Sequence, residues 1–583
     1  FLLVFLLSGL IFAQGQYFST GQDPASIKWK QIKTKKFRII YPENYDRQSQ
    51  YLANILEMVV VQETKTLSAR VPRIPFLIHS RSVISNGLTV WAPRRVELYP
   101  SPPQNSYSEE WLEQLAIHEY RHTVQISKMN QGFTRILSYV FGEQIAGGVL
   151  GLYIPPWFLE GDATATETAL SNSGRGRTSI FENVLRAQLL QKGIYPYDKA
   201  VLGSYRTFVP DAYQLGYPLV AQSRRTYGTG IWNTVLYRTA KYPFMIVPFA
   251  SGIRKATGLT KTKFYHKILS DLSVQWKKQE EAIYSPIRYI TSPNTKYYTS
   301  YVHPVLNNDS TIITEKESID DIDWIVSINR YTGKEKKLVA MGYSSDESIS
   351  TSGDYFAWSE WEPDTRWQNR DFSVIRVYNL RTGKDHYLTR RSRYFAPSIS
   401  PAADAIAAVK TDFLNHSFID ILDIHTGNIN KSFPMNNNDL AMTPNWSPDG
   451  KNLIFTLLTE KGKTLAKLDL QTGRITNFLP FSFMEISGPC YYHNQHIIFA
   501  SDYSGITDLY AVDTMTHRVY RVISTHFSSS DPDFTSDRKT MIFLDYTADG
   551  FKIAETAVDT LKWLPLDSVK DGSVHLYDSI VRQ

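Results

Sequence analysis

Cysteine is almost absent from this sequence: Cys490 stands alone among 583 residues, so no intramolecular disulfide can form. Blocks of lysine and arginine are also missing, and a net charge of +6 is small for the length, which argues against a nucleic-acid-binding protein. After the first 13 residues, no apolar run is long enough to span a membrane; residues 145–157 come closest and contain two prolines. The composition is that of a globular protein, and its length predicts two or three domains.

The beginning of the sequence is almost wholly apolar. Residues 1–13 read FLLVFLLSGLIFA, which is too short to cross a bilayer as a helix, and three polar residues follow. This pattern is typical of a signal peptide, which we expect at residues 1–16 without the basic segment that normally precedes the apolar run. No cysteine lies near the cleavage zone, so we expect no lipid anchor there. An exported chain without disulfides indicates a bacterial protein of the periplasm, the outer membrane or the extracellular space.

The rest of the sequence divides into two parts of different character. Residues 17–285 carry helical periodicities, whereas residues 301–583 carry short strands and turn signals. Residues 286–300 contain proline and serine and are predicted to form a linker. We expect an α+β domain followed by an all-β domain. In the first part, the patterns predict strands at 36–41, 74–78 and 95–99 and helices at 51–67 and 108–129.

The second part is repetitive. A Thr-Gly pair follows a strand-like run four times, and a Thr-His pair stands in the place of a fifth copy, with the threonines 50, 44, 46 and 44 residues apart. Glycine adopts positive φ without steric cost, so these pairs suit hairpin turns. A repeat in the forties with four strands per unit is typical of β-propeller blades, and we count six. The segment Trp446 to Gly450 (WSPDG) and the blade length resemble the TolB-type propeller over nearly half of the chain.

The motif that carries chemistry lies in the predicted helix 108–129. His118 and His122 are four residues apart on one helical face, so both imidazoles can reach a single metal ion. Glu119 is then placed beside the open coordination position, where it can take a proton from a water that Zn²⁺ acidifies to a pKa of about 7. The H-E-x-x-H pattern alone leaves a second interpretation open, in which two helix histidines make ordinary surface hydrogen bonds.

A second segment supplies the ligand that the motif lacks, because catalytic zinc takes three protein ligands. Glu160 and Glu167 are seven residues apart, two helical turns, so both carboxylates face the same way. This arrangement resembles the gluzincin peptidases of the aminopeptidase N type, in which a W-x-x-E-G-x-A-x-x-x-E helix follows H-E-x-x-H. The resemblance implies a zincin-like fold, Glu160 as the third zinc ligand beside His118 and His122, and Glu167 as a carboxylate that orients a ligand imidazole. Asp162 is the alternative ligand, but it points about 200° away from Glu160 around a helix.

The resemblance extends to a tyrosine that stabilises the oxyanion in these peptidases. Tyr213 begins a Y-x-x-G segment like theirs, and Tyr217 is the alternative. The sequence contains 36 tyrosines, so a match to such a short pattern arises easily by chance. The sequence also departs from the family. His122 and Glu160 are 38 residues apart, so residues 132–153 form an insertion, either a helical hairpin packed over the site or a membrane-touching element.

A further departure concerns specificity. The exopeptidase motif G-x-M-E-N is missing, which favours an endopeptidase with its peptide aligned along residues 95–99 as an edge strand. The basic loop 173–177 could receive a carboxylate, but a solvated loop is the preferred interpretation.

The motifs predict an exported zinc-dependent metallopeptidase with Glu119 as general base and Tyr213 at the oxyanion. Its expected partners are a protein or peptide substrate and a protein bound by the propeller, which would control access or recruit substrates. Two alternatives stay open. The chain could be an envelope binding or scaffold protein that uses the propeller surface, although intact ligands and an intact base argue against it. It could also be a zinc hydrolase of non-peptide amides or esters, which only a substrate profile separates from a peptidase.

Overall fold

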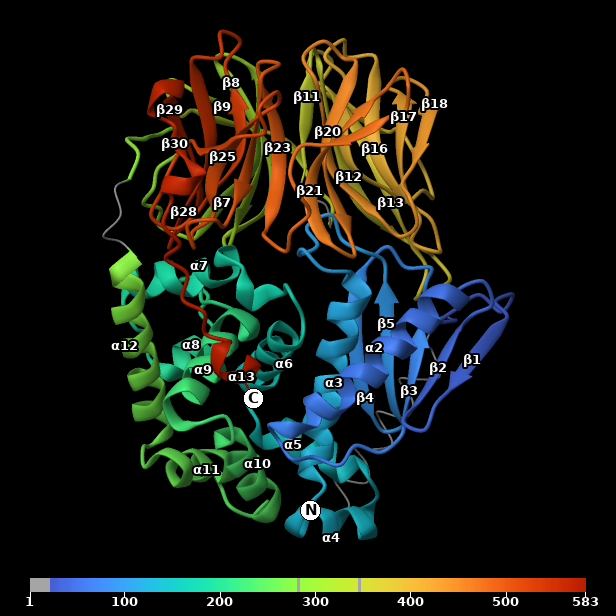
Figure 1. The fold of residues 1–583 in the computed structure, drawn as a ribbon, viewed down its shortest axis with the longest axis vertical. Helices are drawn as coiled ribbons and strands as arrows, with labels where there is room; N and C mark the ends of the chain where they lie inside the picture. Colours follow the sequence, from blue (N-terminus) through green and yellow to red (C-terminus); the bar gives the residue numbers. More distant parts are fainter. Residues whose placement is uncertain (1–20, 280–283, 344–347, 583) are drawn as a thin grey trace.

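The structure is a computed structural model that describes residues 21–279, 284–343 and 348–582 (Figure 1). The predicted signal peptide, residues 1–16, lies outside the described residues. The propeller occupies one end of the molecule, and the α+β part occupies the other (Figure 1). Among the described helices, none combines the length and the apolar character needed to cross a membrane.

The α+β part begins with a five-stranded sheet of order β1-β2-β3-β5-β4. Alternate residues of strands β2 and β3 are buried, and helix α2 covers one face of the sheet with a buried apolar stripe. The predicted strands and the first predicted helix are confirmed within a few residues. The bounds are β1 (Trp29–Lys33), β2 (Phe37–Pro42), α2 (Asp46–Lys65), β3 (Ile74–Ile78), β4 (Ser85–Trp91) and β5 (Arg94–Pro100).

The prediction that residues 95–99 form an edge strand is wrong. Strand β5 pairs with β3 in parallel on one side and with β4 in antiparallel on the other, so it is interior. The edge strand is β4, whose Asn86-Gly87 segment lies within the strand. The order of strands depends on pairing between segments distant in sequence, which local residue patterns do not determine.

Helix α3 contains the H-E-x-x-H motif, and α2, α5, α6 and α10 pack against it. Helix α3 begins at Trp111, three residues later than expected, and the hydroxyl of Ser108 donates to the carbonyl of Met484 in the propeller. Residues 132–153 form a helical hairpin whose second helix, α5 (Gln144–Tyr153), packs against α3 and whose first helix, α4 (Gly132–Phe141), exposes most of its apolar side chains. The bounds are α3 (Trp111–Met129), α4 (Gly132–Phe141), α5 (Gln144–Tyr153), α6 (Pro156–Leu170), α7 (Ser179–Ala187), α8 (Tyr197–Leu202), α9 (Ala212–Tyr227), α10 (Ile231–Lys241), α11 (Pro248–Thr257) and α12 (Lys261–Gln279).

Helices α6 and α9 pack closely because glycines face each other where they cross. A Cβ at Gly216 would lie 1.9 Å from the carbonyl oxygen of Trp157, and a Cβ at Gly161 would lie 2.2 Å from the Gly216 backbone. Any larger residue at either position would push the two helices apart. This contact sets the distance between the segment that carries Glu160 and the segment that carries Tyr213.

The described residues of the second part form six sheets arranged as propeller blades, so the six-bladed prediction is confirmed. The predicted Thr-Gly turns join third to fourth strands, and their glycines have φ between 67° and 73°. From the innermost to the outermost strand, the blades consist of β7–β10 (Thr299–Asn308, Thr311–Ser318, Asp321–Asn329, Glu335–Ala340), β11–β14 (Ser350–Ser352, Tyr355–Pro363, Asp371–Asn379, Lys384–Tyr387), β15–β18 (Tyr394–Ile399, Ala405–Thr411, Ser417–Asp423, Ile429–Pro434), β19–β22 (Leu440–Trp446, Asn452–Thr459, Gly462–Asp469, Ile475–Asn477), β23–β26 (Ile486–Tyr492, His496–Ser501, Asp508–Asp513, Val519–Arg521), and β27–β29 (Ser529–Phe534, Thr540–Thr547, Gly550–Ala557) with β6 (Arg288–Tyr289).

The ring closes through segments from both of its ends. Strand β6, within the predicted linker, pairs with β29 and becomes the outermost strand of the last blade. Strand β30 (Leu564–Pro565) extends the fifth blade by pairing with β26. The chain then returns to the α+β part, where α13 (Asp578–Val581) packs against α6 and α9 and buries Leu576 and Ile580 in their core. The end of the chain therefore holds the two parts together.

Five of the six innermost strands share one irregularity. In each, the register shifts at a residue with positive φ that is followed by proline. Proline has no N–H for the ladder, so it fits where a bulge interrupts pairing. These prolines are Pro304, Pro397, Pro444, Pro489 and Pro532.

The propeller contacts the α+β part on two sides of the H-E-x-x-H helix. On the sheet side, Asp371 accepts hydrogen bonds from the Ser82 hydroxyl, at 2.9 Å, and from the backbone N–H of Val83. On the helical side, Asp502 accepts from the backbone N–H of Ser179 at 2.8 Å. The propeller is thus fixed separately to the sheet and to the helices.

Candidate metal centre

The side chains of the three predicted metal ligands come together at one point. His118 and His122 come from α3 and Glu160 comes from α6, and their ligand atoms all lie within 4.8 Å of one another. The separations are 3.2 Å between the two imidazole Nε2 atoms, 3.3 Å from His118 Nε2 to Glu160 Oε2, and 3.4 Å from His122 Nε2 to the same oxygen. Among the described residues, this is the group of histidine, cysteine and acidic side chains that could hold a metal ion.

These separations suit zinc. With zinc–ligand distances of about 2.0–2.1 Å, the ligands of a tetrahedral site lie about 3.3–3.4 Å apart, since a tetrahedron's edge is about 1.63 times its centre-to-vertex distance. The three measured separations fall within about 0.1 Å of that interval. Two imidazoles and one carboxylate are also a known catalytic zinc donor set. The residues present therefore fit the ion that the sequence predicts.

Neighbouring side chains orient both imidazoles toward the centre. Glu167, an acceptor, lies 2.7 Å from His118 Nδ1, so this nitrogen carries the proton and Nε2 faces Glu160. The amide nitrogen of Gln125 donates to Leu159 O and to Asp162, which leaves its oxygen to accept from His122 Nδ1 at 2.9 Å. The lone pairs of both Nε2 atoms therefore point at the Glu160 carboxylate, an arrangement that a shared cation stabilises.

Glu167 lies where the resemblance placed it, beside a ligand imidazole, and it is fully buried. Burial by itself would raise its pKa, but Arg175 and His118 outweigh burial and lower the pKa to about 2. Arg175 binds both carboxylate oxygens, at 2.7 and 2.8 Å. The interpretation of loop 173–177 as solvated is therefore wrong for Arg175, whose guanidinium also lies 4.9 Å from the centre of the Tyr213 ring.

Glu119 is buried beside the edge strand β4. Its carboxylate accepts a hydrogen bond from the Thr89 hydroxyl at 2.8 Å. The strand approaches so closely that a Cβ at Gly87 would lie 2.5–2.7 Å from atoms of Glu119 and Leu115. Only glycine fits there, so the general-base candidate and the exposed edge of the sheet are held in contact.

Of the two candidate tyrosines, Tyr213 faces the metal centre. Its ring stacks on His118 with 5.8 Å between ring centres, whereas the Tyr217 hydroxyl is buried and donates to the Gly176 carbonyl at 2.8 Å. Burial and the nearby Glu160 carboxylate raise the pKa of Tyr213 above its ordinary value. Tyr213 therefore stays protonated at neutral pH and can donate a hydrogen bond.

Asp162, the alternative ligand, points away from the centre. It is fully buried and accepts hydrogen bonds from Arg121, at 2.7 Å, and from Arg224. Arg121 is the second variable residue of the H-E-x-x-H motif, so this ion pair ties α3, α6 and α9 together on the side opposite the ligands. Asp162 therefore holds these three helices together and does not face the metal centre.

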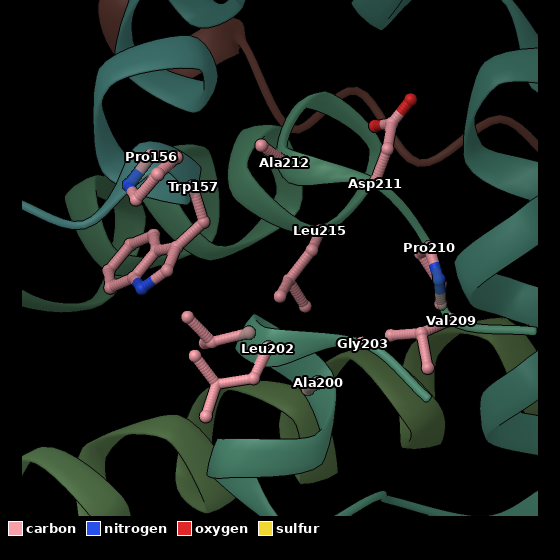
Figure 2. A pocket seen from close by; sticks show the side chains of 11 residues that line it. Pro156, Trp157, Ala200, Leu202, Gly203, Val209, Pro210, Asp211, Ala212 and Leu215 are labelled. Atoms are coloured by element: carbon pink, nitrogen blue, oxygen red, sulfur yellow. The ribbon is translucent and has the colours of Figure 1, made fainter. Parts of the chain in front are cut away.

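A cavity of about 260 Å³, lined mostly by residues with apolar side chains, lies at the N-terminal ends of α6 and α9, one turn before Glu160 (Figure 2). Trp157, Leu202 and Leu215 face it in Figure 2. Its one carboxylate, Asp211, caps α9 by accepting from the Gln214 backbone N–H at 2.8 Å. The cavity offers apolar space, whereas the chemically reactive groups are those around His118.

Two of the residues that contact the site, Gln125 and Thr89, belong to none of the motifs in the sequence. Gln125 follows His122 by three residues on the same helix, a spacing that places the two side chains together and that was available from the sequence. Thr89 lies on β4 and could be found only after the strand pairing was known.

Comparison with known proteins concerns the propeller. A family model of the TolB beta propeller domain matches residues 383–573, which lie outside the metal centre. The chain has no match among curated proteins.

Solved structures with similar folds include an oligogalacturonate lyase in complex with manganese (13% identity, 47% of this chain and 93% of that chain, TM-score 0.34). TolB from Acinetobacter baumannii has 17% identity over 46% of this chain and 68% of its own, with a TM-score of 0.30. A prolyl endopeptidase structure has 11% identity over 53% of this chain and 57% of its own, with a TM-score of 0.32. At these values the neighbours carry no conclusion about chemistry, so the function must be argued from the site. The C-terminal part of the chain is a six-bladed β-propeller that is similar to the TolB beta propeller domain over residues 383–573.

Proposed function

We propose that this protein is a zinc-dependent hydrolase that cleaves peptide bonds, with His118, His122 and Glu160 as the metal ligands. The observation that carries the proposal is the set of separations between their three ligand atoms, 3.2–3.4 Å, which match the edges of a tetrahedral zinc site. A zinc ion held there supplies Lewis-acid chemistry, since it acidifies water and polarises a carbonyl oxygen.

The other residues have roles that follow from their positions. Glu119, held by Thr89, accepts the proton of the attacking water and passes it to the leaving nitrogen. Tyr213, protonated and stacked on His118, donates a hydrogen bond to the oxygen on which negative charge develops. The exposed edge of β4 pairs with an extended peptide beside Glu119. These roles favour an endopeptidase, because the site places no extra carboxylate on β4 to hold a free amine.

The apolar segment at residues 1–13 supports export, so we place this activity outside the cytoplasm. The propeller, fixed to both sides of the α+β part, would restrict which substrates reach the centre.

The test measures metal content and cleavage in the wild type and in Glu119→Gln. We expect about one zinc per chain in both. Cleavage of an unfolded protein such as reduced casein should fall by about 100- to 10,000-fold in the variant, because the general base is lost. Glu113→Gln, on the same helix, is the control and should keep wild-type cleavage. A zinc-free wild type, or unchanged cleavage in Glu119→Gln, would refute the mechanism. A chain that binds zinc and cleaves neither peptides nor other amides and esters would support the scaffold alternative.

A further inference from the structure

Helix α4 exposes its apolar side chains to solvent and buries a polar one. The one buried residue of this helix is a polar one, Thr134, whose hydroxyl donates to the Ala240 carbonyl at 2.7 Å. Its aromatic and aliphatic side chains point outward instead. A surface helix of a globular protein normally buries its apolar side. The exposed members are Phe133, Ile136, Tyr139, Val140 and Phe141, and all but Phe133 are more than half exposed.

Two neighbouring segments continue this surface. The loop between α10 and α11 exposes Phe244 (72%), Ile246 (93%) and Val247 (58%), and α5 exposes Leu152 (73%). The segments are in contact, since the rings of Phe133 and Phe244 are 4.7 Å apart and the hydroxyl of Tyr153 donates to Pro243 O at 2.7 Å. We call the nine exposed side chains of α4, α5 and this loop the apolar tip. Helices α4, α10 and α11 lie at the end of the molecule opposite the propeller (Figure 1).

The charge around the apolar tip has one sign. Residues 231–257, from the start of α10 to the end of α11, contain four lysines and arginines (Arg238, Lys241, Arg254 and Lys255) and no aspartate or glutamate. Arg135 and Lys241 are exposed beside the tip, and the cation of Lys241 lies 5.3 Å from the Tyr242 ring centre. The one acidic residue of α4, α5 and the corner between them, Glu143, is paired with Arg94 at 2.8 Å. An excess of positive charge of this kind attracts an anionic surface.

We propose that the apolar tip docks onto an anionic phospholipid bilayer. Lysine and arginine next to tyrosine suit the headgroup region, where the cations bind phosphates and the rings lie between polar and apolar layers. Helix α4 has ten residues, too few to cross a bilayer, so it lies in the plane of the interface with its apolar side chains between the lipids. The propeller then points away from the membrane.

A lipid surface fits these features better than a protein partner. The tip consists of side chains that project singly from a helix and a loop. The acidic residue of residues 132–153, Glu143, is already paired with Arg94, so it is not available to a second copy's lysines and arginines. A second copy of this chain would bring its positive charges against the same charges. Like charges facing each other across an interface oppose association.

The experiment is co-sedimentation of the full chain with vesicles of phosphatidylcholine mixed with phosphatidylglycerol, and with vesicles of phosphatidylcholine alone. We expect binding to the mixed vesicles that weakens as salt is raised. The double variant Ile136→Glu/Ile246→Glu should reduce that binding at least about tenfold, because two inserted side chains become anionic. Residues 1–20 are the same in every variant, so a difference between variants reports on the tip.

The matched control is Met515→Glu/Leu561→Glu on the propeller, where both side chains are more than 80% exposed. It adds the same charge and should bind vesicles as the wild type does. Equal binding by the two double variants would overturn the proposal, and so would the absence of wild-type binding to the mixed vesicles. A wild-type dimer in light scattering that Ile136→Glu/Ile246→Glu dissociates, without vesicle binding, would assign the tip to a second copy. Peptide cleavage in solution is measured on the same samples and should not change.

Discussion

Replacing Glu167 with glutamine tests the metal centre through a residue that is not a ligand. Its carboxylate accepts hydrogen bonds from His118 Nδ1 at 2.7 Å, from two nitrogens of Arg175 and from Gln114. Glutamine has the same shape but brings one acceptor oxygen and one NH₂ group. In either orientation, the NH₂ group must therefore face a donor.

Both orientations weaken zinc binding. If NH₂ faces His118 Nδ1, the imidazole shifts its proton to Nε2 and the ligand atom is blocked. If NH₂ instead faces Gln114 and Arg175 Nε, His118 Nδ1 keeps a neutral amide oxygen in place of a carboxylate, which orients the imidazole less strongly. In both orientations the mostly buried Arg175 guanidinium loses its counter-charge. Loss of such an orienting partner costs about 10- to 100-fold in metal affinity. At about 1.4 kcal/mol per factor of ten, the expected loss is about 1.4–2.7 kcal/mol.

The assay is a competition titration of zinc against a chromophoric chelator at constant pH, with circular dichroism to check the fold. Glu113→Gln changes a carboxylate of the same helix and should leave zinc affinity unchanged. A zinc affinity for Glu167→Gln within twofold of the wild type, in a folded chain, would refute the assignment of Glu167 as the residue that orients His118.

Two other predictions concern stability. Asp162→Ala removes the counter-charge of buried Arg224 and leaves buried Arg121 with Glu63, 3.9 Å away, as its remaining acidic partner. It should lower the free energy of unfolding by about 3–5 kcal/mol, measured by chemical denaturation; a loss below 1 kcal/mol, on the scale of about 0–1 for exposed pairs, would contradict the role of this ion pair. His79 lies between Asp23 (2.9 Å) and Glu97 (3.6 Å); burial lowers its pKa, but these carboxylates outweigh burial and raise it to about 9. Because the folded pKa exceeds the unfolded value of about 6.5, the stabilisation is present below pH 6.5 and is lost as the pH rises through 9. Thermal melts should show a smaller decrease in melting temperature over this range in His79→Gln than in the wild type, and equal decreases would exclude His79 as the cause.

The sequence predicts the propeller well because each blade repeats the same local requirement. The Thr-Gly turns need positive φ at the glycine, and the structure has it at all four. The sequence contains a second repeat on which the prediction does not rest: a proline follows the bulge residue in five of the innermost strands. The closure could not be predicted, because the two residues of β6 pair with a strand more than 260 positions later. Such pairing depends on the completed ring and leaves no local pattern.

The candidate site also has one part that the sequence predicts and another that it does not. The relative positions of His118 and His122, and of Glu160 and Glu167, follow from helical periodicity, so sequence spacing places them correctly. Arg175 follows α6 in a short 3₁₀ turn, and its pairing with Glu167 depends on how that turn folds back. The same holds for strand β4, whose place at the sheet edge brings Gly87 against Glu119. Local spacing identifies the candidate ligands, whereas the groups that orient them come from tertiary contacts.

Hydrogen bonds between the propeller and the α+β part lie on both sides of the candidate site. His118 and His122 lie on α3, which packs against the sheet, whereas Glu160 lies on α6 in the helical region. The propeller is bonded to the sheet side through Asp371 and to the helical side through Asp502. A change in the separation of the two sides would have to break one of these buried contacts, since each carboxylate binds both a backbone N–H and a serine hydroxyl. The propeller is therefore bonded to both regions that carry the candidate ligands, and α3 and α6 also pack directly against each other.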